Sequence, residues 1–93
     1  MNKKKLRKAR SKIDLIDNNI INLLKKRTRI VNHMLSLKQF KKQIIDRKRI
    51  NEILKNMRNK SIKHSVDPKI ISNIWKSIIW SYIDYQKRNF KKK

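Results

Sequence analysis

The fold of this 93-residue chain is decided by residues 6–38, LRKARSKIDLIDNNIINLLKKRTRIVNHMLSLK. One stripe through this stretch recurs in alternating steps of four and three: Leu6, Arg10, Ile13, Asp17, Ile20, Leu24, Arg27, Val31, Met34 and Lys38. A neighbouring apolar stripe contains Ala9, Ile16, Leu23, Ile30 and Leu37. This period predicts one amphipathic helix, about 50 Å long at 1.5 Å per residue. The rest of the chain is too short to cover such a helix, so we expect it to pair with a second chain.

The segment that follows loses this period and then regains it. Residues 39–45, QFKKQII, are predicted to form a connection. A second helix is predicted over residues 46–63, with Asp46 as a plausible N-cap. Gly is absent and Pro68 is the only proline, so nothing in the sequence interrupts these helices.

A third helix is predicted from Pro68 to about Asn89. Asp67 suits the N-cap and Pro68 the first helical position. The expected fold is therefore all-α, with a long, a short and a medium helix. We expect residues 1–93 to form one domain, with disordered tails at residues 1–4 and 91–93.

Composition narrows the classes of protein. Lys and Arg number 28 against 6 Asp and Glu, a net charge of +22, and we expect most of this charge to be solvated surface. Cysteine is absent and His33 and His64 are isolated, so neither disulfides nor a metal is expected to stabilise the chain. No apolar run approaches the roughly 20 residues of a membrane span, and no apolar segment follows the basic start as in a signal peptide. We expect a cytoplasmic protein.

Four charged residues occupy the main stripe of the first helix: Arg10, Asp17, Arg27 and Lys38. Buried cations are costly without partners. The charged residues of this stripe can set the register of a coiled coil, with their charged ends reaching water. Alternatively, the cations can bind an anion inside a helical bundle. Arg27 and Lys38 are about 16 Å apart along the helix, close enough for long side chains to converge on one ligand. Arg10 lies about 25 Å from Arg27, so it can serve the same site only from another, antiparallel chain.

The other two helices carry polar candidates that pattern alone does not distinguish from ordinary positions. Taken alone, Arg49 is typical of a solvated helix residue and Gln86 of a surface residue near a helix end. Tyr82 is typical of a core residue, four positions before Gln86 and therefore on the same helix face.

Taken in order, these positions form a pattern that spans about residues 5–90. It reads Arg10-x-x-Ile13-Asp14-x-Ile16-Asp17, Leu23-Leu24-x-x-Arg27, Val31, Lys38, Asp46-x-x-Arg49, Ile53-Leu54-x-x-Met57 and Ile78-Ile79-x-x-Tyr82-x-x-x-Gln86. The ordered set resembles the all-helical chorismate mutases.

The resemblance implies an intertwined homodimer with two sites, each for a small dicarboxylate such as chorismate or isochorismate. Arg10 would reach one substrate carboxylate from the other chain, and Arg27 would bind the second. Lys38 would bind the ether oxygen together with a carboxylate, and Gln86 would bind the same ether oxygen. Arg49 would support the site and its charge. No cofactor and no metal is implied.

Two activities of this scaffold compete, and three further residues expected to bind substrate bear on the choice. Mutases, which make prephenate, typically carry Glu where this chain has Ile50. Isochorismate pyruvate lyases, which make salicylate and pyruvate, resemble this chain in an aliphatic residue there and in the Tyr-Ile-x-x-Gln ending that begins at Tyr82. The spacing from Lys38 to Arg49 also fits the lyase, whereas Asp46 is the residue of many mutases. The lyase is favoured and the mutase is the alternative.

Two interpretations from other classes stay open. The charge is also typical of a small basic nucleic-acid-binding protein, although no recognised binding motif accompanies it. The helices alone would equally suit an interaction module without chemistry.

Overall fold

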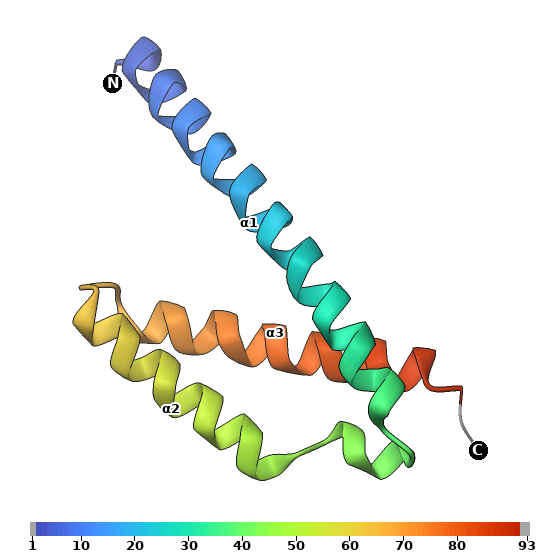
Figure 1. The fold of residues 1–93 in the computed structure, drawn as a ribbon. Helices are drawn as coiled ribbons and strands as arrows, with labels where there is room; N and C mark the ends of the chain where they lie inside the picture. The colour runs from blue at the N-terminus through green and yellow to red at the C-terminus, as the bar shows by residue number, and fades with distance from the viewer. Residues whose placement is uncertain (1, 92–93) are drawn as a thin grey trace. The chain divides into compact units, whose positions relative to one another are not determined.

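The computed structural model describes residues 2–91 of the chain. Its elements are α1 (Lys3–Leu37), the short 3₁₀ helix η1 (Lys41–Ile44), α2 (Arg47–Lys63) and α3 (Pro68–Asn89) (Figure 1). The described residues contain no strand, so the predicted all-α class with a long, a short and a medium helix is confirmed. No helix among them is long and apolar enough to cross a membrane.

The first helix begins earlier than its apolar period indicates. The side chain of Asn2 accepts a hydrogen bond of 3.0 Å from the backbone N–H of Lys5, which satisfies one of the donors exposed at a helix start. Lys3 and Lys4, expected in a disordered tail, are therefore the first residues of α1. At the other end, Lys91 is exposed and outside the helix; the expected disorder of residues 1 and 92–93 lies outside the described residues.

Contacts divide the chain into two compact units, at the boundary between His33 and Met34. The first unit consists of α1 up to His33, a single helix that has no second element of its own to pack against. Large apolar side chains of this unit are 48–66% exposed: Ile13, Leu15, Ile16, Ile20, Ile21, Leu23 and Ile30. The apolar surface of this unit is therefore left uncovered.

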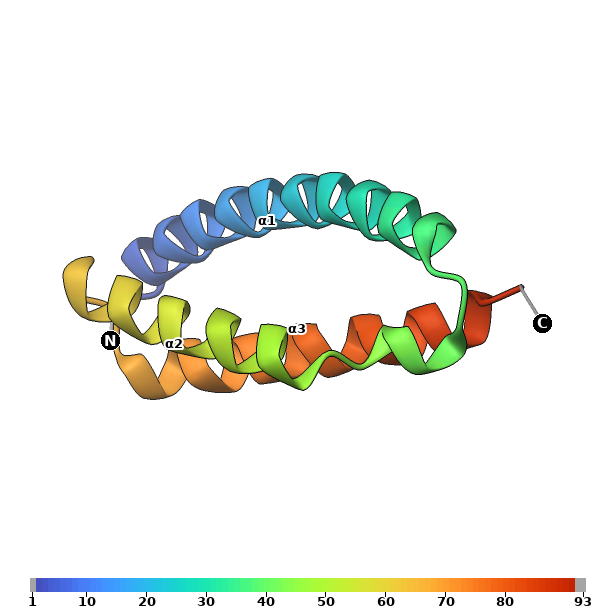
Figure 2. The ribbon, with the colours of Figure 1, turned by 60° about the horizontal axis from the view of Figure 1, so that its bottom comes forward.

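The second unit holds the end of α1 together with η1, α2 and α3. Helices α2 and α3 lie side by side as a helical hairpin, and η1 packs on α3 (Figure 2). The buried cluster of this unit consists of Leu35, Ile44, Ile79 and Ile83. Partly buried residues pack around it: Ile45, Ile50, Ile53, Leu54 and Phe90.

Both predicted N-caps are confirmed. The side chain of Asp46 accepts a 3.1 Å hydrogen bond from the N–H of Arg49 at the start of α2. The side chain of Asp67 accepts one of 2.8 Å from the N–H of Lys69, and Pro68 opens α3. A carboxylate at each position satisfies a donor that would otherwise lack a partner in the helix.

The segment 39–45 is more than the plain connection that its lost period predicted. It contains η1, and Ile44 is only 4% exposed within the buried cluster. The segment is too short for a period to emerge, so its one core residue was not apparent.

The end of α2 carries a residue in the left-handed region. The N–H of Val66 donates to the carbonyl of Ser61 at 2.9 Å, and the N–H of Ser65 donates to that of Ile62 at 3.2 Å. These two bonds form a Schellman motif, whose turning residue usually is Gly. Here it is Ser65, with φ +56°.

We expect Ser65→Gly to stabilise the protein by about 0.5–1 kcal/mol, because Gly adopts a positive φ without steric cost. Thermal unfolding followed by circular dichroism would show a midpoint a few degrees higher. Ser65→Ala, which keeps the Cβ, is the matched control. Equal midpoints for the Gly and Ala variants would contradict this account of the turn.

Candidate active site

Lys38 and Gln86 are 48 residues apart in sequence and meet in the second unit. The Lys38 Nζ donates a 2.7 Å hydrogen bond to Oε1 of Gln86. Lys38 is half-buried, and Gln86 is only 8% exposed. The surface position that pattern alone predicted for Gln86 is therefore wrong. Gln86 follows Ile79 and Ile83 on the buried face of α3, at steps of four and three residues.

The amide of Gln86 is held in one orientation. Its Nε2 donates a 3.2 Å hydrogen bond to the backbone carbonyl of Tyr82 while its oxygen accepts from Lys38. An amide nitrogen carries two hydrogens and a lysine ammonium three. Both groups can therefore still donate to a ligand while they remain bonded to each other.

Burial lowers the pKa of the Lys38 ammonium from its ordinary 10.5, because a charged group loses hydration when it is partly enclosed. The carboxylate of Asp46 acts in the opposite direction and raises this pKa. Asp46 therefore has two effects: it caps α2 and it favours the charged form of Lys38.

This pairing predicts the effect of Asp46→Asn on a reaction that needs the Lys38 ammonium. Asn remains a good N-cap but removes the negative charge, so the pKa of Lys38 falls further. The ammonium is then lost at a lower pH, and the alkaline limb of the kcat/KM profile should move toward neutrality. An alkaline limb that stays in place, or moves up, would contradict this electrostatic role.

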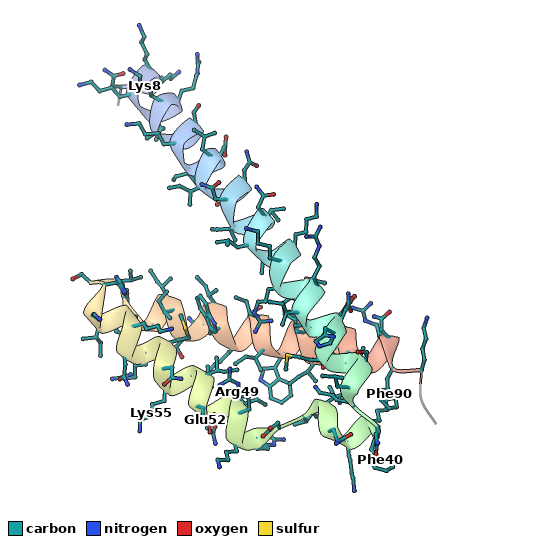
Figure 3. All side chains as sticks on the ribbon, viewed as in Figure 1. Lys8, Phe40, Arg49, Glu52, Lys55 and Phe90 are labelled. Atoms are coloured by element: carbon teal, nitrogen blue, oxygen red, sulfur yellow. The ribbon has the colours of Figure 1, made fainter. Side chains whose placement is uncertain are left out.

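Three other candidate residues, Arg49, Ile50 and Tyr82, belong to the same unit. The Nη1 of Arg49 is 3.6 Å from Oε2 of Glu52, and the two side chains, 60% and 49% exposed, belong to neighbouring turns of α2 (Figure 3). Such an exposed pair is weak, so Arg49 remains available to a ligand. Ile50 packs against the buried cluster, and Tyr82 is half-buried with its ring edge-on to Tyr85 at 6.2 Å.

The remaining candidates, Arg10 and Arg27, belong to the first unit. Arg10 is exposed and Arg27 has an intermediate exposure on α1. Their participation in a site with Lys38 stays a prediction.

Sequence analysis missed one residue that holds the turn after Lys38. The Gln43 side-chain oxygen accepts hydrogen bonds from the N–H groups of both Gln39 and Phe40, each 2.8 Å long. The available signal was spacing: a Gln three residues after the residue that begins a helical turn is typical of a capping interaction.

Fold and site together define an all-helical protein with a partly enclosed cation and amide, a combination suited to a small anionic ligand with an acceptor oxygen. The model of the chorismate mutase type II family matches residues 9–87, and the chain belongs to this family. It is thus a chorismate mutase-like pericyclic enzyme. Comparisons with curated proteins and with solved structures found no match.

Proposed function

We propose that the protein is an isochorismate pyruvate lyase, which converts isochorismate to salicylate and pyruvate, with chorismate mutase as the second candidate. The observation that carries the catalytic part is the 2.7 Å hydrogen bond between Lys38 and Gln86. It supports a site in which two donors lie close enough to serve one ether oxygen. The choice between the two reactions rests on other residues.

Neither reaction requires a nucleophile or a cofactor. In the lyase reaction the ring C–O bond breaks while a ring hydrogen moves to the enolpyruvyl methylene, which becomes the methyl group of pyruvate as the ring becomes aromatic. In the mutase reaction the same bond breaks as a C–C bond forms. Both reactions require the enolpyruvyl group to be held over the ring, so the enzyme contributes chiefly by positioning.

Two cationic groups can hold the substrate in this shape. Arg27 of the same subunit would bind one carboxylate, and Arg10 of the partner subunit would bind the other. A guanidinium suits this role because it forms two parallel hydrogen bonds with a carboxylate. Arg10 and Arg27 of one chain lie about 25 Å apart on α1 and cannot bind one small ligand together. The proposal therefore requires a homodimer.

The exposed apolar surface of the first unit supports such a dimer. Its large apolar side chains are 48–66% exposed, and a second copy of α1 carries the complementary stripe. Burying this stripe would also give the small chain the larger core that a stable protein needs.

Negative charge builds on the ether oxygen as its bond to the ring stretches. The ammonium of Lys38 and the second amide hydrogen of Gln86 would stabilise that charge more strongly in the transition state than in the substrate. Because Lys38 is partly desolvated, its charge is less screened than that of an exposed lysine.

Ile50 supports the lyase over the mutase. Its aliphatic side chain packs against the buried cluster and offers no acceptor for the substrate hydroxyl that a Glu would bind in a mutase. Asp46 and the family description support the mutase as the second candidate.

A paired turnover assay on the purified protein tests the proposal. Salicylate release from isochorismate would be followed by fluorescence and chorismate loss by ultraviolet absorbance. We expect salicylate to form well above the rate of chorismate consumption. Prephenate as the main product would favour the mutase, and no turnover of either substrate would reject both.

A further inference from the structure

We infer that Gln43 is a positioning residue for Lys38, acting through the turn that carries it; this inference rests on the proposed function. The oxygen of Gln43 holds the two N–H groups that directly follow Lys38, those of Gln39 and Phe40, at 2.8 Å each. Lys38 itself contacts the amide of Gln86, which belongs to α3 and not to this turn.

Lys38 needs such support because it lies outside regular structure. Helix α1 ends at Leu37, and the N–H of Lys38 makes a final turn bond of 3.2 Å to the carbonyl of Leu35. The next helical residue is Lys41. Lys38 therefore depends on the two ends of a short turn for the placement of its backbone.

The two ends are fixed by burial. Leu35 precedes Lys38 and Ile44 follows it in the chain, and both belong to the buried cluster. Between them, the backbone could still change direction at residues 39 and 40, where the side chains are exposed. One oxygen that accepts from both N–H groups locks this part of the turn, and the N–H of Gln43 itself donates to the carbonyl of Phe40 at 3.0 Å.

The chemistry at Lys38 makes this constraint matter. A donor must lie within hydrogen-bond distance of an oxygen that gains charge only in the transition state, and a shift of about 1 Å can cost up to 100-fold in rate. A long lysine side chain can also leave its enclosed position for water when its backbone is released. Gln43 thus holds Lys38 in the geometry that the proposed reaction requires.

The test compares four forms of the protein: wild type, Gln43→Met, Gln43→Glu and Gln39→Met. Methionine has a similar length and no oxygen acceptor, whereas glutamate keeps an oxygen that can accept from both N–H groups. Gln39→Met is the matched control, because it makes the same exchange at an exposed side chain and leaves the backbone N–H in place.

Gln43→Met should lower kcat about 10-fold with KM changed by less than about twofold. Lys38 should become more hydrated, so the alkaline limb of the kcat/KM profile should move to higher pH. Amide hydrogen exchange at Gln39 and Phe40 should accelerate in this variant. Gln43→Glu should retain the wild-type kcat, KM and amide exchange. Its carboxylate adds a negative charge, so the alkaline limb is compared only among wild type, Gln43→Met and Gln39→Met. Gln39→Met should match wild type in all three measurements.

The outcomes separate the inference from the function on which it rests. Wild-type turnover and an unmoved alkaline limb in Gln43→Met, despite faster exchange at Gln39 and Phe40, would overturn the positioning role alone. Unchanged exchange at those two amides would overturn the turn geometry. A wild-type protein that turns over neither substrate would reject the proposed function and this inference with it.

Discussion

Replacing Lys38 by Ala should lower kcat on the order of 100-fold or more while the protein stays folded. The ammonium is the cationic donor proposed for the ether oxygen, and removing one such donor commonly has an effect of this size. Lys38 is only half-buried, so its truncation should leave the buried cluster intact. Steady-state kinetics with the preferred substrate measures the loss, and circular dichroism verifies the helices.

Lys41→Ala is the control for this prediction. It removes the same charge three residues later, from an exposed position in η1, and we expect turnover within about twofold of wild type. Full activity of Lys38→Ala, or an equal loss in both variants, would contradict the assignment. Equal losses would indicate that overall charge, and not the contact with Gln86, determines the rate.

The second large effect is complementation between two inactive variants. If Arg10 serves the site of the other chain, Arg10→Ala and Lys38→Ala should each be inactive as homodimers. A heterodimer of the two variants contains one site with both defects and one with neither. That second site combines Lys38 of the Arg10→Ala chain with Arg10 of the Lys38→Ala chain. The heterodimer should recover about half of the wild-type activity.

Two affinity tags allow this heterodimer to be purified after coexpression, and each doubly tagged preparation can be assayed per dimer. A heterodimer of wild type with the doubly substituted chain provides the comparison. Each of its sites lacks either Lys38 or Arg10, so it should be nearly inactive. Recovery only in that second heterodimer would place Arg10 and Lys38 of one chain in the same site. About half of the wild-type activity in both heterodimers would exclude Arg10 from the site.

The helices could be predicted because their signals are local. The alternating steps of α1 and the capping side chains of Asp46 and Asp67 lie within a few residues of the features they determine. Helix α1 begins at Lys3, three residues before the start predicted at Leu6, because Asn2 provides a cap before the first apolar position. The lysines before Leu6 carry no apolar period, but the cap from Asn2 still makes them helical.

The site was harder to predict from the sequence, because its contacts join segments that are distant in the chain. Gln86 pairs with Lys38 across 48 residues. Its spacing from Ile79 and Ile83 is consistent with the buried face of α3, but no local feature shows which group it contacts. The family pattern predicted Gln86 as a site residue, which periodicity alone did not. Gln43 was missed because Phe40, which begins its helical turn, is not a usual capping residue, and the three-residue spacing from Phe40 to Gln43 was the only signal.

The proposed site is tested most directly by a crystal structure of the protein bound to a stable bicyclic dicarboxylic ether that mimics the transition state. We predict that the ether oxygen accepts hydrogen bonds from Lys38 and Gln86 of one subunit. One carboxylate should lie on Arg27 of that subunit and the other on Arg10 of the partner subunit. A ligand bound away from Lys38 and Gln86, or a site completed within a single chain, would contradict the account.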